Sequence, residues 1–172
     1  MIWNRRTWMT LGAISGLAFD GRTLWVCDRA LNKLYQVDLV SGQVIRSLTG
    51  PGLRPVGLTF TGRHLVVGDN YADLVYLTDP ATGRLIRSFS GPGGGVQGPA
   101  FDGRTLWLSC QGTATLNQVD IVTGRLIRSV GSPSSLPTGN AFDGRTLWNL
   151  DDNTNTIYQV DMVTGRVIRS VA

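Results

Sequence analysis

The chain repeats itself every 41 residues. The octapeptide AFDGRTLW occurs at 18–25, 100–107 and 141–148, and a looser copy, TFTGRHLV, occurs at 59–66. The interval of 41 holds without insertion for Phe19, Phe60, Phe101 and Phe142. A fixed period of this size is typical of repeat architectures, in which each unit buries its apolar surface on its neighbours. The octapeptide is therefore either a repeated element of the scaffold or a repeated site.

Each repeat is expected to form a four-stranded antiparallel meander. In the unit 16–56 we predict strands over 16–19, 23–27, 33–37 and 43–48. Asp20-Gly21 favours a tight hairpin after the first strand, because glycine tolerates positive φ and aspartate bonds its own backbone. Apolar residues occupy both faces of the second strand, which therefore needs a sheet on each side. With no glutamate, one lysine and 22 glycines in the chain, we expect essentially no helix.

Four-stranded sheets stacked radially satisfy this pattern, and we predict an all-β fold, a β-propeller of four 41-residue blades. A solenoid is the alternative. We expect one domain over 1–172, with blades at about 16–56, 57–97, 98–138 and 139–172. Residues 1–15 form a surplus segment in which 3–8 match the fourth strand of a repeat.

Ring closure leaves two possibilities, a monomeric four-bladed ring or half of an eight-bladed ring. In a half ring, an uncovered blade face of about 600 Å² would forgo about 15 kcal/mol of burial, at about 25 cal/mol per Å². A deficit of this size is comparable with the whole stability of a domain. We therefore predict a homodimer that closes eight blades through its blade faces.

The segments LWVCD, KLYQVD and TGRLIRS resemble the blades of the NHL, YVTN and glutamine-cyclotransferase-like propellers over nearly the whole chain. This resemblance implies the fold, while the families include enzymes, sensors and binding modules. The resemblance also implies that glutaminyl cyclisation, where such propellers catalyse it, relies on an acidic residue that is typically glutamate. The chain contains no glutamate, so no catalytic residue is carried over.

The net charge of +4 comes from the outer strands, which carry Arg5, Arg6, Arg46, Arg87, Arg128 and Arg169. We expect these arginines to protect exposed strand edges from aggregation. Since they form no clustered basic groove, we predict no nucleic-acid binding. The chain has no apolar run of 18 residues and no recognisable secretory signal, so we expect a cytoplasmic protein that does not bind membranes. Cys27 and Cys110 are out of phase by one position and are expected to be free thiols.

The two ends of the blades differ in variability. The DGR and TGR turns at one end barely change, whereas the loops at the other end differ in every repeat. We call this second end the varied face; it comprises 28–32, 69–73, 111–115 and 151–155, with the connections 48–55, 89–96 and 130–137. Recognition is expected there, because binding residues concentrate on variable loops.

Candidate ligand-binding residues are the polar side chains of the varied face: Asp28, Asp69, Asn70, Asp73, Asp151, Asp152 and Asn153. No spacing among them matches a calcium loop, and the single histidine, His64, lacks identifiable partners, so we predict no metal and no cofactor. Trp25, Trp107 and Trp148 share one strand position and are expected to pack between blades.

The sequence favours a non-enzymatic, self-assembling scaffold or binding module, with an unidentified small ligand at the varied face. Insertion-free repeats are also typical of an engineered or recently amplified protein. The alternative is a monomeric four-bladed propeller with a site on the varied face. It would act as a lyase or hydrolase with Asp151 or Asp152 as base, or as a lectin using Tyr71.

Overall fold

A computed structural model describes residues 12–172 as sixteen β strands in four sheets. The segment 1–15, expected to be surplus, falls mostly outside these residues. Blade 1 contains β1 (Ile14–Phe19), β2 (Leu24–Asp28), β3 (Lys33–Val37) and β4 (Val44–Thr49). Blade 2 contains β5 (Pro55–Phe60), β6 (Leu65–Asp69), β7 (Leu74–Thr78) and β8 (Leu85–Ser90). Blade 3 contains β9 (Val96–Phe101), β10 (Thr105–Cys110), β11 (Thr115–Asp120) and β12 (Leu126–Gly131). Blade 4 contains β13 (Pro137–Phe142), β14 (Leu147–Asp151), β15 (Thr156–Val160) and β16 (Val167–Val171).

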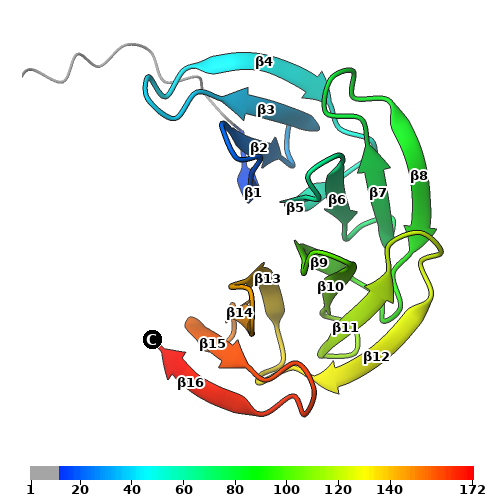
Figure 1. Cartoon of the computed structure of the whole chain (residues 1–172), viewed down its shortest axis with the longest axis vertical. Helices are drawn as coiled ribbons and strands as arrows, with labels where there is room; N and C mark the ends of the chain where they lie inside the picture. Colours follow the sequence, from blue (N-terminus) through cyan, green and yellow to red (C-terminus); the bar gives the residue numbers. More distant parts are fainter. Residues whose placement is uncertain (1–11) are drawn as a thin grey trace, which may run out of the picture.

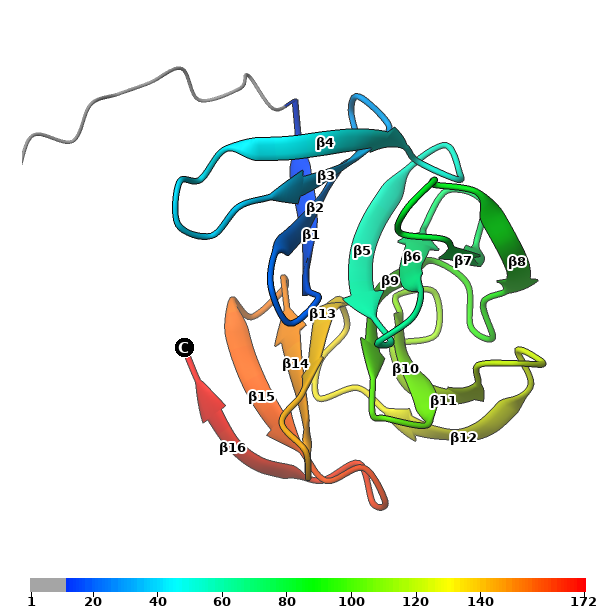
Figure 2. The ribbon, with the colours of Figure 1, turned by 45° about the horizontal axis from the view of Figure 1, so that its top comes forward.

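Every blade is a meander of consecutive antiparallel strands, from an inner strand to an outer one (Figures 1 and 2). This confirms the predicted all-β fold of four four-stranded blades. Strand bounds differ slightly from those expected: β1 begins at Ile14 rather than at Gly16, and β2 covers Leu24–Asp28 rather than 23–27. No helix occurs within residues 12–172.

The four blades lie along an arc. Inner strands contact one another in chain order, β1 with β5, β5 with β9 and β9 with β13. Figure 1 shows the arc open on one side, between blade 4 and blade 1. The chain is thus a four-bladed β-propeller whose first and last blades each have a neighbour on one side.

The core lies between the blades, in three apolar clusters. Trp25 and Leu34 of blade 1 pack with Leu65 of blade 2, and Trp107 of blade 3 packs with Leu147 of blade 4. Trp25 and Trp107 are each 1% exposed, which confirms the prediction for these two residues. Trp148 is only half-buried, because blade 4 has no following blade, so the prediction is wrong for the third tryptophan in the single chain.

Glycine at one position of each inner strand allows the blades to approach closely. A Cβ added to Gly16 would lie 2.8 Å from the Cα of Gly57, and one added to Gly57 would lie 2.8 Å from the Cα of Gly98. The same distance separates a Cβ on Gly98 from the Cα of Gly139. On Gly139 itself, the nearest atom would be the Cβ of Leu150 at 3.7 Å, because no further blade lies beside it.

The octapeptide AFDGRTLW builds the hairpin between the first two strands of a blade. In blade 1, Asp20 Oδ1 accepts from the backbone N–H of Thr23 at 2.6 Å. Its Oδ2 accepts from the Thr23 hydroxyl at 2.5 Å and from the Trp25 indole Nε1 at 2.9 Å. Burial alone would raise the pKa of Asp20, but these donors outweigh it and hold the pKa at about 2. The motif is therefore part of the scaffold.

Candidate functional site

The varied face is organised by buried aspartates at the ends of the second strands. The Asp28 carboxylate accepts backbone N–H bonds from Gly12 at 2.6 Å, Ala13 at 3.1 Å, Ala30 at 2.9 Å and Leu31 at 3.0 Å. Burial would raise the pKa of Asp28, and the four amides lower it below its ordinary value. This side chain fastens the loop after β2 to the segment before β1.

Asp69 repeats the arrangement in blade 2. Its carboxylate accepts from the amides of Leu53 at 2.7 Å and Arg54 at 2.9 Å on the connection, and of Tyr71 at 2.9 Å and Ala72 at 3.0 Å on the loop. Burial raises the pKa of Asp69, but these four amides lower it further, so the pKa lies below its ordinary value. Both carboxylates are saturated by the protein's own backbone.

Asp151 has the same role in blade 4, accepting from the amides of Leu136 at 2.9 Å, Asn153 at 3.0 Å and Thr154 at 3.1 Å. Cys110 takes this repeat position in blade 3. Three of the residues expected to bind a ligand thus use their carboxylates to hold the loops of the varied face.

The other four predicted residues are spread over the loops. Asp73 has a left-handed backbone (φ 55°) and accepts from the amide of Val96 at 3.3 Å. The Oδ1 atom of half-buried Asn70 is buried without a hydrogen-bond partner. Asp152 and Asn153 are exposed. The structure brings none of these four together as a cluster with a shared partner.

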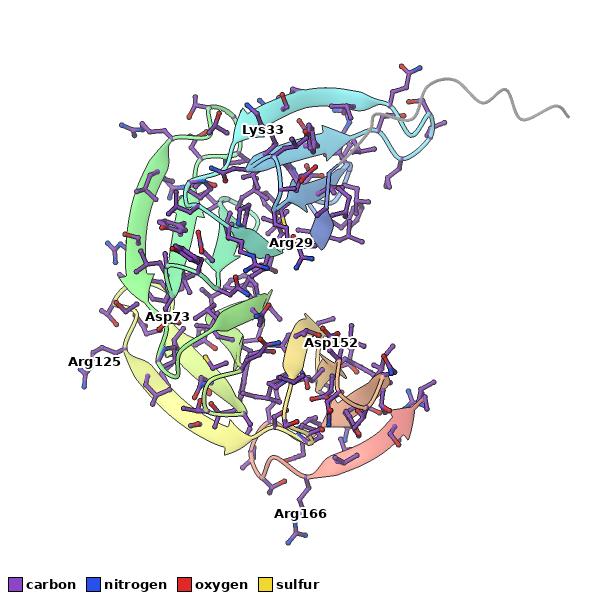
Figure 3. The ribbon with its side chains drawn as sticks, turned by 180° about the vertical axis from the view of Figure 1, so that it is seen from behind. Arg29, Lys33, Asp73, Arg125, Asp152 and Arg166 are labelled. Carbon is purple, nitrogen blue, oxygen red and sulfur yellow. The ribbon has the colours of Figure 1, made fainter. Side chains whose placement is uncertain are left out.

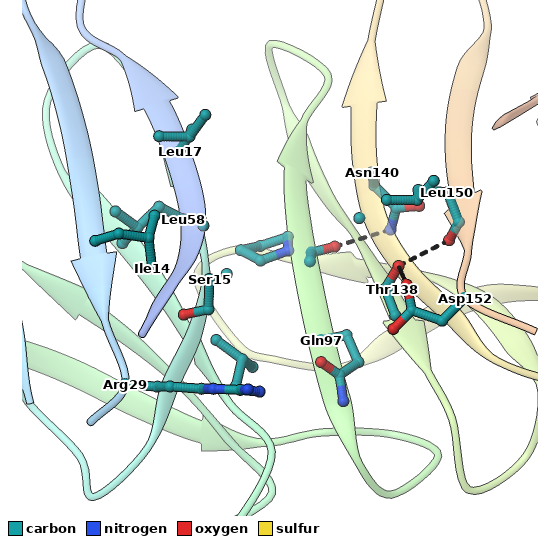
Figure 4. Close-up of a pocket in the computed structure, with 16 residues that line it drawn as sticks. Ile14, Ser15, Leu17, Arg29, Leu58, Gln97, Thr138, Asn140, Leu150 and Asp152 are labelled. Carbon is teal, nitrogen blue, oxygen red and sulfur yellow. Dashed lines mark hydrogen bonds between the residues drawn. The ribbon is translucent and has the colours of Figure 1, made fainter. Parts of the chain in front are cut away.

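A cavity of about 480 Å³ lies at the centre of the arc, against the inner strands (Figure 4). Its polar lining includes Arg29 of blade 1, Gln97 of blade 3 and Thr138 of blade 4, together with Asp152. The Thr138 hydroxyl donates to the Leu150 carbonyl at 3.1 Å and to Asp152 Oδ1 at 3.4 Å. Figure 3 shows Arg29 and Asp152 on blades at the two ends of the arc.

Sequence reasoning missed Gln97 and Thr138, because it searched loops and these residues lie in inner strands. A signal was nevertheless present. Their repeat position holds Ser15 in blade 1 and Val56 in blade 2, so the side chain changes in every blade while the adjacent glycine is constant.

A second hollow, which we call the lateral groove, lies on the varied face between blades 1 and 2. It has a volume of about 500 Å³ and is lined by Ala13, Arg29, Ala30, Leu53, Arg54 and Tyr71. Leu53 is 70% exposed and Tyr71 is 71% exposed. Two arginines therefore border accessible apolar surface, and one of them, Arg29, also lines the central cavity.

The remaining candidates lie apart from both hollows. Cys27 and Cys110 are buried free thiols, and burial raises the pKa of each. His64 is half-buried in the second hairpin, and burial followed by the charge of Arg63 lowers its pKa. Within residues 12–172, no three His, Cys, Asp or Glu side chains are placed to ligate a metal together. This part of the chain also contains no helix that could span a membrane.

The four blades, the constant hairpin turns at one end and the varied face at the other define a small β-propeller. No protein-family model and no curated protein sequence matches the chain. The expected relation to the NHL, YVTN and glutamine-cyclotransferase-like families therefore stays a prediction.

Two solved structures are similar to the chain. Hydrazine synthase of Kuenenia stuttgartiensis aligns with a TM-score of 0.71 and 21% identity, over 99% of this chain and 52% of that chain. The chain thus spans about half the length of that protein's chain. The computationally designed Ika4 protein aligns with a TM-score of 0.66 and 21% identity, over 90% of this chain and 94% of that chain. At these identities the likenesses show the fold alone.

Proposed function

We propose that the protein is a non-enzymatic propeller scaffold that pairs with a second copy to close an eight-bladed ring and presents its varied face for binding. The proposal rests on the two end faces of the arc. The face of blade 4 that points away from blade 3 repeats the residues by which blades 1 and 3 pack on the next blade. The matching face of blade 1 repeats those that receive them.

One comparison of burial carries the proposal. Leu34 and Leu116 are 0% exposed at their interblade contacts, whereas Ile157, at the same position in blade 4, is 43% exposed. On the receiving side, Leu58 is 5% exposed and its counterpart Leu17 in blade 1 is 59% exposed. Apolar side chains that are exposed at the ends of the arc, and buried at the same positions between blades, favour an interaction at both end faces. The surface most complementary to each end face is the blade face that packs against it elsewhere in the chain, and a second copy offers that face.

Polar groups at the end faces are also incomplete in the single chain. Arg128 donates from blade 3 to the Met162 carbonyl of blade 4 at 3.1 Å. Its counterpart Arg169 lies 4.8 Å from the centre of the Trp148 ring, at the outer edge of the last blade. In the closed ring, Arg169 would face the turn at Leu39 and Val40 of the second copy.

Charge is complementary at the inner end of the same junction. Arg29 and Asp152 occupy one repeat position, in the first and the last blade. Joining blade 4 of one copy to blade 1 of another would bring these opposite charges side by side. The twofold ring would contain this pairing twice, because a closed dimer has two identical junctions.

Mass in solution tests the proposal. Multi-angle light scattering should give twice the chain mass of 18.6 kDa, about 37 kDa. Ile157→Glu should reduce the mass to 18.6 kDa without unfolding the chain, because the side chain is already part-exposed. The matched control, Val122→Glu, changes a 59% exposed valine in a turn and should leave the dimer intact.

Gly139→Ala gives a sharper test. The single chain has room for this methyl group. Between blades 1 and 2, a Cβ on Gly16 would lie only 2.8 Å from the Gly57 Cα. In the closed ring, the methyl group on residue 139 would meet Gly16 of the second copy in the same way. The variant should therefore fold as a monomer. A wild-type mass of 18.6 kDa, or an unaffected dimer in both variants, would rule out the eight-bladed ring.

The repeats also bear on the origin of the chain. Insertion-free units and the likeness to a designed propeller support an engineered or recently amplified repeat protein. In such a protein the scaffold is shared by all blades, and a binding specificity would arise where single blades depart from the common sequence.

A further inference from the structure

We infer that the lateral groove binds an organic carboxylate whose acid group is attached close to an aromatic or branched apolar group. The inference deepens the proposed binding role of the varied face and does not depend on ring closure. A free small molecule and the C-terminal residue of a peptide share this chemistry.

The groove residues are not required by the blade architecture. The position of Arg54 holds alanine, glycine and leucine in the other repeats, and that of Leu53 holds glycine, glycine and serine. Tyr71 replaces alanine, glycine and asparagine, and Arg29 replaces asparagine, glutamine and aspartate. Since the other blades fold without these side chains, their meeting between blades 1 and 2 is not explained by folding. Binding explains why two arginines, a leucine and a tyrosine converge there.

Hydrogen bonds to buried aspartates fix the loops that carry these side chains. Asp28 bonds the amides of Ala13 and Ala30, and Asp69 bonds those of Leu53, Arg54 and Tyr71. Five of the six lining residues are therefore anchored through their own backbone to a buried carboxylate. An anchored backbone lowers the ordering cost of binding.

Charge and shape determine the chemical class. Arg29 and Arg54 line the groove, and none of the described residues that line it is acidic. The carboxylates of Asp28 and Asp69 lie beneath the loops and are occupied by amides. Arginine binds carboxylates through two parallel N–H bonds, while Leu53 and Tyr71 offer apolar surface next to the charges. The volume of about 500 Å³ is in the range of small-molecule sites.

Titration followed by nuclear magnetic resonance tests the inference with N-acetyl-phenylalanine as the probe. We expect saturable shifts of the amides of residues 53, 54 and 71, with a dissociation constant of about 1 mM or below. N-acetyl-phenylalanine amide, which lacks the negative charge, should bind at least about 5-fold more weakly. Short peptides ending in phenylalanine, with free or amidated C-termini, separate the two sources. A peptide acid that binds more tightly than the probe indicates a peptide terminus, and equal binding indicates a small molecule.

Variants locate the site. Arg54→Gln and Arg29→Gln should each weaken binding by about 5-fold or more, and Tyr71→Ala should weaken it similarly. All three side chains are exposed, so the melting temperature should not change. Arg104→Gln, on the constant end, is the matched control and should leave binding unchanged. Equal affinity for acid and amide, or unchanged affinity in Arg54→Gln and Arg29→Gln, would overturn the inference. Arg29 also lies at the proposed ring junction, whereas Arg54, in blade 2, does not. Arg54→Gln together with the mass of the same samples therefore separates a failure of ligand binding from a failure of ring closure.

Discussion

The guanidinium group of Arg46 donates from blade 1 to the main-chain carbonyl of Ala81 in blade 2, at 2.8 Å. The same side chain donates through Nε to Gln36 at 2.8 Å and lies 5.4 Å from the centre of the Trp25 ring. Arg128 forms the corresponding contact between blades 3 and 4. Outer arginines, which the sequence suggested were edge protection, therefore also connect neighbouring blades.

Replacing Arg46 should weaken the junction between blades 1 and 2. Arg46→Ala removes two charged hydrogen bonds and a cation–π contact, and we expect the free energy of unfolding to fall by about 1–2 kcal/mol. Urea denaturation would measure the loss. Arg87→Ala is the comparison and should cost less, because Val66 stands where blade 1 has its tryptophan and because, among the described residues, Arg87 forms no hydrogen bond to the next blade. Equal losses would show that neither the hydrogen bond to Ala81 nor the indole contact contributes to stability.

The hairpin aspartate should matter more than the arginine beside it. Asp20→Ala leaves the Thr23 amide, the Thr23 hydroxyl and the Trp25 indole without their acceptor, and we expect a loss of about 2 kcal/mol of unfolding free energy. Arg22→Ala should change stability by less than about 0.5 kcal/mol, since the exposed side chain can be lost while its backbone N–H still donates to Asp20. Thermal melting of the two variants gives the comparison, and a larger effect for Arg22 would contradict it.

Stability should fall in acid. The folded pKa of Asp20, about 2, lies below its unfolded value of about 3.9. A lowered folded pKa stabilises the protein fully above about pH 4, and this stabilisation is lost as the pH falls toward 2. The pKa values of Asp28, Asp69 and Asp102 are lowered as well, so several groups act in one direction. Urea midpoints between pH 6 and pH 2 would record the decline, which Asp20→Asn should make shallower; a flat profile would contradict the prediction.

One loop residue should be improvable. Ala114 has a left-handed backbone, with φ of 49°, at the position where the other blades have Asn32, Asp73 and Asn155. Alanine is strained there because its Cβ crowds the backbone, whereas glycine is not. Ala114→Gly should therefore raise the free energy of unfolding by about 0.5–1 kcal/mol. Ala81→Gly, at a turn position without positive φ, should lower it, and stabilisation by both would indicate another cause.

The pattern within one repeat was sufficient to predict the fold. A 41-residue period, the Asp-Gly hairpins and strands apolar on both faces together favoured stacked four-stranded sheets over a solenoid, because neighbouring blades cover both sides of such strands. The shared strand position also indicated that Trp25, Trp107 and Trp148 pack between blades, which holds for the first two and not for Trp148 at the end of the arc. Strand ends were predicted to within about two residues, the limit of sequence patterns.

The site was less accessible from sequence. Asp28, Asp69 and Asp151 were identified by position as ligand candidates, and the structure shows their carboxylates bound to loop amides. A sequence does not show that its own backbone occupies a side chain, since the amides of Leu53 and Arg54 reach Asp69 from 15 and 16 residues away.

By itself, the sequence determined the blade, its four strands and the constant and varied ends, because these follow from local periodicity repeated four times. Only the tertiary structure decided that Arg29, Arg54 and Tyr71 line one groove, and that Gly139, alone of the four equivalent glycines, has no blade on the side where a Cβ would lie. Both depend on how successive blades lie relative to one another. That relation arises from contacts between residues about 41 positions apart, and no local pattern specifies it.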